Sequence, residues 1–249
     1  MKTVYPAILN LTKLEHDDNN LITTVPVLDK GYVRRADFMG SDLSVVNAAR
    51  ASFAKESKEL SQADARLINF LWREQHLSCF RHAFISFEFK APLMVARQHW
   101  KYIVGSDHTM DGWNESSRRY ITAEEEFYIP KAEEWRSSPE NKKQGSGDPV
   151  QLEVGSLAFQ MLMEDVDRQL AHYRWAMDND ICAEQARLFL PAYGLYVNYR
   201  WSASLQSVLH FLNQRLADDA QKEIQEYAKA VHIISQPLFP ITFEAFELL

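Results

Sequence analysis

The sequence predicts a single α+β domain in which an antiparallel-type sheet is flanked by long helices. Residues 31–38, 83–90 and 195–203 alternate apolar and polar side chains with the two-residue period of strands. Residues 150–179 place apolar side chains, among them Leu157, Met161 and Val166, at helical spacing over a much longer stretch, and Met161 and Met163 are core candidates. The chain has 249 residues, of which 46% are hydrophobic and 24% charged. That is long enough for a sizeable core and typical of a globular protein.

Composition and charge exclude several classes of function. The net charge of −7 gives no support for a nucleic-acid surface, which usually carries a basic patch. The two cysteines, Cys79 and Cys182, have no metal-type or redox-type spacing. With no signal segment, so few cysteines predict the reducing cytoplasm, and no apolar run reaches the ~20 residues of a membrane span. The chain also lacks the glycine motifs of Rossmann and P-loop sites.

Helix-capping residues, apolar periodicity and the positions of proline and glycine predict the remaining elements. We expect residues 1–27 to be an extension that packs on the body or on a neighbouring subunit, and residues 28–249 to form the domain. Pro92 suits the first turn of a helix. We further expect helices at 42–52, 61–75, 150–179, 180–190 and 218–234, a helix capped by Ser202–Ser204, loops at 76–82 and 137–149, a lid at 104–113, a short strand at 126–130 and a C-terminal tail after Pro240.

A polar stretch between Arg97 and Tyr120 is the strongest candidate for a functional site. In a helix, Arg97 and Lys101 share one face, and Gln98 and Tyr102 form a second pair one step around. The end of this stretch, Asn114–Tyr120, combines hydroxyls, a carboxylate and two arginines. It is either an anion site, since arginine binds phosphate bidentately, or a solvated loop with Glu115–Arg119 pairing. On composition alone both interpretations stay open.

Other polar residues lie on otherwise apolar helices. Arg187 requires an anionic or polar partner, which is either a nucleotide phosphate or a structural salt bridge. Gln206 and His210 share a helix face, while Arg215 lies about 140° around from His210. A group made of Asp107, His108 and Asp111 matches no established zinc pattern, so we expect no metal.

Several motifs together resemble the flavin-dependent thymidylate synthases. The signature is carried by Ala96-Arg97-Gln98 followed by Asn114-Glu115-x-Ser117-x-Arg119-Tyr120. One departure is that Lys101-Tyr102-Ile103 stand where the family usually has Arg-His-Arg. Family-like segments occur in the family's order, which is more specific than any single motif, at Leu28–Phe53, Phe89–Gln98, Glu126–Pro130, Ala186–Pro191 and Phe211–Ala228.

The resemblance implies a methyltransferase that converts dUMP to dTMP by reductive methylation, with FAD, NADPH and methylenetetrahydrofolate. It also implies a homotetramer with shared active sites, which the unpaired arginines and polar helix face of one subunit favour too. Arg215 would stabilise negative charge on the pyrimidine. Beside Arg215, the expected dUMP-binding residues are Gln98, Lys101, Glu115, Ser116, Ser117, Arg118, Arg119 and Arg187. The expected FAD-binding residues are Ser52, His76, Ser78, Lys101, Tyr102, Ile103, Glu115, Ser204, Gln206 and His210.

Two alternatives follow from the departure at Lys101–Ile103. Tyr102 and Ile103 cannot replace two charged donors, which predicts weaker flavin binding, a shifted pocket or a different modification at C5. The chain would then be a related pyrimidine C5-modifying enzyme, such as a dUMP hydroxymethylase, or a nucleotide-binding homologue without catalysis.

Overall fold

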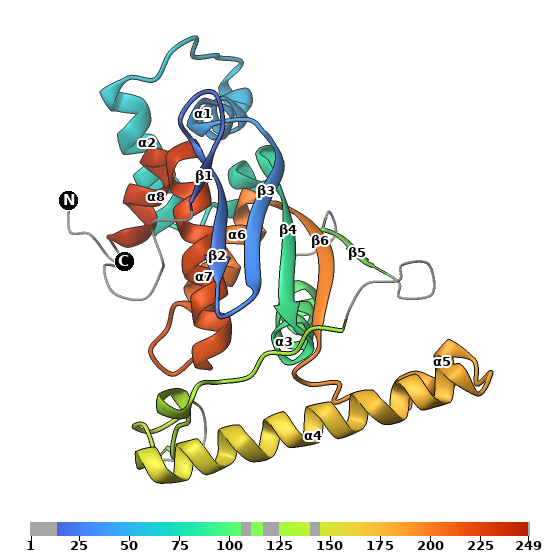
Figure 1. Ribbon diagram of the computed structural model, residues 1–249. Coiled ribbons are helices and arrows are strands. Elements are labelled where there is room, and N and C mark those ends of the chain that lie inside the picture. Colours follow the sequence, from blue (N-terminus) through green and yellow to red (C-terminus); the bar gives the residue numbers. More distant parts are fainter. Residues whose placement is uncertain (1–13, 106–110, 117–124, 140–144, 249) are drawn as a thin grey trace.

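The computed structural model describes residues 14–105, 111–116, 125–139 and 145–248 (Figure 1). Its centre is a six-stranded sheet with the order β1-β2-β3-β4-β6-β5, in which every neighbouring pair is antiparallel. The predicted α+β class and antiparallel sheet are therefore confirmed. The strands are β1 (Glu15–His16), β2 (Ile22–Val27), β3 (Gly31–Met39), β4 (Phe84–Pro92), β5 (Gly112–Glu115) and β6 (Tyr196–Ser204).

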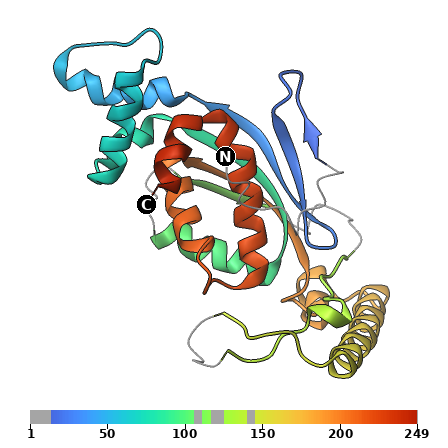
Figure 2. The same cartoon turned by 90° about the vertical axis from the view of Figure 1, so that its left-hand side faces the viewer.

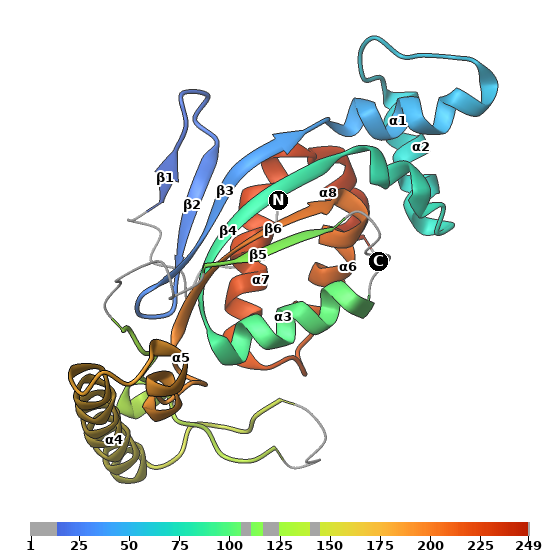
Figure 3. The ribbon, with the colours of Figure 1, turned by 90° about the vertical axis from the view of Figure 1, so that its right-hand side faces the viewer.

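Helices cover one face of this sheet (Figures 2 and 3). The alternation in β4 places Ile85, Phe87 and Phe89 in the core beneath them, as predicted. Short 3-10 helices in the described ranges occupy 51–53, 77–82, 132–134, 187–189 and 236–238. The α-helices are α1 (Asp42–Arg50), α2 (Gln62–Arg73), α3 (Leu93–Gly105), α4 (Leu152–Asp178), α5 (Ala183–Ala186), α6 (Leu205–Arg215), α7 (Lys222–Ser235) and α8 (Pro240–Glu247).

Serine side chains fix where three helices begin. Ser41 caps α1, Ser61 caps α2 and Ser204 caps α6, each by accepting a backbone N–H of the first turn. The first residue of α1 has a second role. The buried carboxylate of Asp42 accepts hydrogen bonds from the backbone N–H of Ile241 and Thr242 and from the Thr242 hydroxyl, so it joins α1 to α8.

Several expected elements differ from the structure. The prediction of a C-terminal tail after Pro240 is wrong, because Pro240 begins α8. Proline is well suited to the first position of a helix. The loop at 76–82 contains a 3-10 helix, and the strand at 126–130 is only the isolated bridge between Phe127 and Leu195. Strand β5 begins at Gly112, within the lid expected at 104–113, and ends at Glu115, beyond that lid.

The N-terminal segment contributes strands to the same sheet. Val27 in β2 pairs with Gly31 in β3, across a turn in which Leu28 has a φ of 57°. The expected division between residues 27 and 28 falls in this turn and stays a prediction. None of the helices in the described part of the chain is both long and apolar enough to span a bilayer.

Helix α4 lies beside the sheet-and-helix body and is packed along only part of its surface (Figure 1). Val166 is buried, as predicted, in a small cluster with Phe127, Leu190 and Leu195. The prediction that Leu157, Met161 and Met163 face a core within the chain is wrong. Their side chains are 58%, 58% and 37% exposed, because the cluster is too small to cover more than one side of the helix.

Candidate functional site

A pocket of about 530 Å³ lies between helix α3 and strand β5. We call it the α3–β5 pocket. It brings together the two cations of one helix face, a carboxylate and two indoles. The residues that line it are Leu93, Ala96, Arg97, Trp100, Lys101, Trp113 and Glu115.

Helix period and strand register explain why these residues meet. Arg97 and Lys101 are four residues apart on α3, so their side chains share one face, as predicted. Strand β5 pairs with β6 so that Trp113 lies opposite Trp201 and Glu115 lies opposite Tyr199. Arg97 from the first half of the signature and Glu115 from its second half therefore line one pocket.

The aromatic floor of the pocket is continuous with the core. The Trp113 ring stacks on Tyr199 with centroids 4.1 Å apart, and Trp100 meets Trp113 edge-on at 5.3 Å. Behind them lies His99, fully buried, with its Nδ1 3.1 Å from the Tyr199 hydroxyl. Burial, with the nearby charge of Arg215, lowers the pKa of His99 to about 3. This histidine is therefore neutral at physiological pH.

Glu115 stands at the end of β5, at the rim of the pocket. Its side chain reaches solvent, but the protein around it partly desolvates the carboxyl and raises its pKa. The neighbouring Ser116 donates its backbone N–H to the Asn198 carbonyl at 2.8 Å, which holds the chain to β6 just beyond the carboxylate. The backbone that carries Glu115 is thus held in place, and its carboxylate lines the same pocket as the cations of α3.

A second polar group lies on the next face of α3, where that helix meets α6. The guanidinium carbon of Arg215 lies 3.6 Å from the centroid of the Tyr102 ring, and the His210 ring lies 6.3 Å from the same ring. Tyr102 thus reaches both residues, although Arg215 and His210 point to different sides of α6. We call Tyr102, Gln206, His210 and Arg215 the α3–α6 polar face.

Two atoms of this face are buried and lack partners within the described ranges. They are the acceptor Oε1 of Gln206 and the donor Nε of Arg215. Burial also lowers the pKa of His210, which keeps its ring neutral. Because Gln206 and Arg215 are nine residues apart on α6, this acceptor and this donor can serve separate polar groups of an extended ligand such as FAD. The residues present therefore fit a flavin.

The other predicted flavin residues are more dispersed. His76 and Ser78 are exposed, at the start of the 3-10 helix 77–82 that packs against α6, and Ser52 is exposed in the 3-10 helix that follows α1. The side chain of Ile103 is only 6% exposed and belongs to the core, whereas Ser204 is 2% exposed and uses its hydroxyl to cap α6. Neither Ile103 nor Ser204 therefore presents a free polar side-chain atom to a ligand.

Gln98 and Arg187 lie away from the α3–β5 pocket. The Gln98 side-chain amide donates to the Gln221 side-chain carbonyl. Arg187 donates its Nε–H to the Ala183 carbonyl at 3.1 Å, at the far end of α4, and forms no ion pair with another described residue. Its predicted salt-bridge partner is thus absent from the described residues, and its phosphate role stays a prediction.

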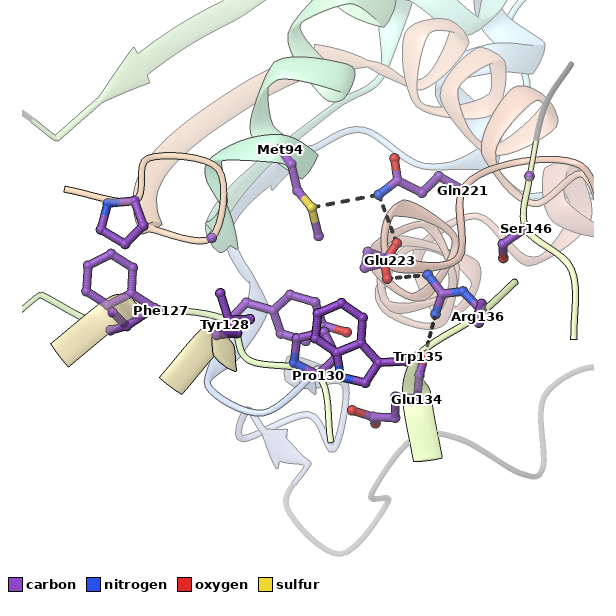
Figure 4. Close-up of a pocket in the computed structure, with 15 residues that line it drawn as sticks. Met94, Phe127, Tyr128, Pro130, Glu134, Trp135, Arg136, Ser146, Gln221 and Glu223 are labelled. Carbon is purple, nitrogen blue, oxygen red and sulfur yellow. Dashed lines mark hydrogen bonds and ion pairs between the residues drawn. The ribbon is translucent and has the colours of Figure 1, made fainter. Parts of the chain in front are cut away.

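Gln221 borders a second pocket, of about 540 Å³, which sequence reasoning missed (Figure 4). Its amide donates to Glu223 at 2.8 Å and faces the sulfur of Met94 at 3.9 Å, and Glu223 pairs with Arg136. The other walls are mostly apolar and include Tyr128, with Glu134 and Ser146 as further polar side chains. The only predicted site residue connected with it is Gln98, through Gln221.

Some predicted residues lie outside the described ranges, namely Ser117, Arg118 and Arg119, together with Asp107 and His108. Asp111 is described and accepts a hydrogen bond from the Trp201 indole at 3.3 Å. A search of the described residues finds no group of three or more histidine, cysteine or acidic side chains placed to hold a metal ion.

Sequence reasoning also missed the indoles of Trp100 and Trp113. For Trp100 the available signal was its position, since it follows Arg97 by three residues and therefore shares its helix face. Trp113 gave no such signal, because β5 was not predicted as a strand. Its place depends on its pairing with β6.

Comparisons with known proteins show the family to which the chain belongs. The family model described as thymidylate synthase complementing protein matches residues 36–241. A flavin-dependent thymidylate synthase of Thermus thermophilus is 38% identical over 225 residues, covering 90% of this chain and 78% of that protein. Another, from Rickettsia prowazekii, is 37% identical over 240 residues, covering 91% and 79%.

A solved structure is similar in fold as well as sequence. It is the UMP/dUMP methylase PolB of Streptomyces cacaoi bound with 5-Br dUMP, with a TM-score of 0.76 and 26% identity, covering 90% of this chain and 97% of that one. The family model covers most of this chain, and the two relatives extend the match. The chain therefore belongs to the flavin-dependent thymidylate synthase family of methyltransferases.

Proposed function

We propose that this protein converts dUMP to dTMP, using FAD, NADPH and methylenetetrahydrofolate. The observation that carries the proposal is the convergence of Arg97, Lys101 and Glu115 with two indoles in the α3–β5 pocket. Beside it lies the α3–α6 polar face, since Lys101 and Tyr102 are neighbours in sequence and belong one to each. The solved relative bound with a dUMP analogue supports the same class of substrate.

In this proposal the α3–β5 pocket binds the nucleotide. Arg97 and Lys101 provide the positive charge for a phosphate, and Glu115 accepts a hydrogen bond from a base N–H or a sugar hydroxyl. The exposed edge of Trp100 and the ring of Trp113 offer a stacking surface for the pyrimidine. Further dUMP contacts are proposed for Gln98, Ser116, Ser117, Arg118, Arg119 and Arg187.

The α3–α6 polar face would hold the flavin. Gln206 offers its unpaired acceptor, Arg215 its unpaired donor, and His210 a neutral ring. His76, Ser78 and Ser52 complete the proposed flavin contacts. A bound flavin supplies the redox chemistry of the methylation. Arg215 keeps its positive charge in a partly desolvated place and stabilises negative charge that develops on the pyrimidine.

The dispersion of these residues supports a homotetramer with shared sites. Arg187 lies at the end of α4, whose exposed side chains include Leu157, Met161 and Trp175. An apolar surface of this kind is typical of an interface. A second copy that covers α4 would carry Arg187 toward another subunit's pocket. The two free cysteines agree with a cytoplasmic location, which we also propose.

A related C5 modification of dUMP is the second candidate, favoured by one observation. Ile103 is buried in the core, so a position that usually carries a charged donor in the family offers none here. Hydroxymethylation would leave an oxygen on the transferred carbon and need no hydride transfer to it.

Product analysis separates these functions. Purified protein is incubated with dUMP, methylenetetrahydrofolate and NADPH, with and without FAD, and the nucleotide is identified by mass spectrometry. The proposal expects dTMP that depends on FAD. A hydroxymethyl product would favour the second candidate, and no product with tight dUMP binding would favour a homologue without catalysis.

A further inference from the structure

Arg215 is a half-buried cation supported by an aromatic ring. Its guanidinium carbon stands 3.6 Å from the Tyr102 centroid. Of the described carboxylates, none forms an ion pair with it, although Asp219 is close enough to favour its charged form. Burial acts in the opposite direction and lowers the pKa of Arg215. The charge is thus retained without a neutralising partner.

The nearest titratable rings do not add positive charge. His99 is fully buried, and the charge of Arg215 helps to lower its pKa to about 3. The His210 ring lies 6.3 Å from the same tyrosine ring, and burial lowers the pKa of His210. With both imidazoles neutral, Arg215 is the cation of the α3–α6 polar face.

A tyrosine and a carboxylate would support this arginine with different consequences. A carboxylate would orient the guanidinium but also cancel most of its field. The face of an aromatic ring attracts the cation through its quadrupole and fixes its plane while leaving the net charge in place. The Nε–H of Arg215 is buried and has no acceptor within the described ranges, so a donor remains available as well.

We propose that Tyr102 is the positioning residue that holds the Arg215 guanidinium in place for the reaction. This inference rests on the proposed function, because it concerns the electrostatic role of Arg215 there. Tyr102 itself need not touch the pyrimidine. Its ring, and not its hydroxyl, performs the role, because the contact is made with the face of the ring.

The test is a set of variants with a double-mutant cycle. Tyr102→Leu removes the ring and Tyr102→Phe keeps it. The two are combined with Arg215→Gln, and kcat and KM for dUMP are measured. Tyr32→Leu is the matched control, because it removes a cation–π contact with Arg34 at 5.9 Å elsewhere in the sheet.

Tyr102→Leu should lower kcat about tenfold with little change in KM, as expected when a desolvated cation–π contact supports an interaction made in the transition state. Tyr102→Phe and Tyr32→Leu should stay within about twofold of the unmodified protein. In the Arg215→Gln background, Tyr102→Leu should have no further effect, because the two residues act as one unit. Equal losses with and without Arg215 would overturn the proposal, as would failure of Tyr102→Phe to preserve kcat.

A second readout does not depend on turnover. The rate at which phenylglyoxal modifies Arg215 is measured by mass spectrometry in the same variants. Tyr102→Leu should expose the guanidinium and accelerate modification, while Tyr102→Phe should not. If the unmodified protein made no dTMP, the proposed function would fail, whereas an unchanged modification rate in Tyr102→Leu would overturn the positioning contact itself.

Discussion

The indole of Trp113 stacks on the ring of Tyr199, with centroids 4.1 Å apart and an angle of 19° between the planes. Tyr199 in turn stacks on Phe89 at 4.9 Å, inside the core. A short edge strand is thereby joined to the centre of the sheet through side chains as well as through its ladder. The wall of the α3–β5 pocket that carries Glu115 depends on this stack.

Replacing each pocket tryptophan should separate stability from binding. Trp113→Ala should lower the free energy of unfolding by about 2 kcal/mol, since it removes a half-buried ring and its stacking contact. Trp100 is 46% exposed, so Trp100→Ala should cost less than about 1 kcal/mol. Both should weaken dUMP binding, measured by calorimetry beside urea unfolding. If Trp100→Ala bound dUMP normally, the stacking role assigned to it would be wrong.

The two cations of α3 should recognise the phosphate rather than the base. Lys101→Met and Arg97→Met should each weaken dUMP binding about tenfold, as for loss of a charge-assisted hydrogen bond. Deoxyuridine, which has no phosphate, should bind each variant as it binds the parent. Lys58→Met serves as the control, because Lys58 is exposed and does not line the α3–β5 pocket. An equal loss of deoxyuridine binding would place the cations elsewhere on the ligand.

Glu115 should make dUMP binding sensitive to mild acid. Partial burial raises the pKa of its carboxyl above the usual value of 4.5, so it takes up a proton sooner than an exposed carboxyl as the pH falls. Protonation removes the acceptor, and affinity should therefore decline as the pH falls through this raised pKa. Glu115→Gln should remove that decline. Because burial penalises only the charged form, Glu115→Gln should not reduce stability at pH 7, and a large loss there would contradict this assignment.

His99 should make the folding stability depend on pH below its usual pKa of 6.5. Its folded pKa of about 3 lies below the usual 6.5, so below pH 6.5 the unfolded chain binds more protons. Stability should then fall with pH, by at most ~1.4 kcal/mol per unit from this group. His210 and His232 have lowered pKa values too and contribute with the same sign.

His99→Phe should flatten that dependence between pH 6.5 and 4, while lowering stability overall because the Tyr199 hydroxyl loses its partner. Urea midpoints across this range provide the measurement. His82→Asn, at an exposed histidine, should leave the slope unchanged. A slope that His99→Phe leaves as steep would mean that His99 is not the group responsible.

The exposed side of α4 should be where subunits meet. Leu157→Glu and Met161→Glu place charges on an apolar surface and should convert a tetramer into smaller species in sedimentation velocity. Glu164→Gln, at an exposed polar position of the same helix, should not. A parent protein that sediments as a monomer would contradict both the interface and the shared sites.

Periodicity and capping predicted much of the fold because they are local. The alternation of Ile85, Phe87 and Phe89 identified β4 before any tertiary contact was known. Ser41 likewise predicted the start of α1, while Ser61 and Asp64 were both candidates for the start of α2, which Ser61 caps. Strand β5 escaped prediction because four residues, Gly112–Glu115, are too few to show a period. Helix α8 escaped because Pro240 can end one helix or begin the next.

The candidate site shows the same division. The shared face of Arg97 and Lys101 follows from helix geometry and was predicted. The contact between Tyr102 and Arg215 depends on how α3 crosses α6, which no local pattern contains. Likewise, the outward face of α4 resembles a core face in sequence, because an apolar stripe is the same whether it packs within a chain or between chains.

One absorption spectrum tests most directly whether this chain is a working flavoenzyme that acts on dUMP. The purified protein is incubated with FAD, desalted, and its visible absorption recorded before and after NADPH is added. We predict retained flavin bands that bleach with NADPH and return in air. A colourless protein that still binds dUMP would contradict the account, and Lys101–Ile103 would then be the first segment to examine.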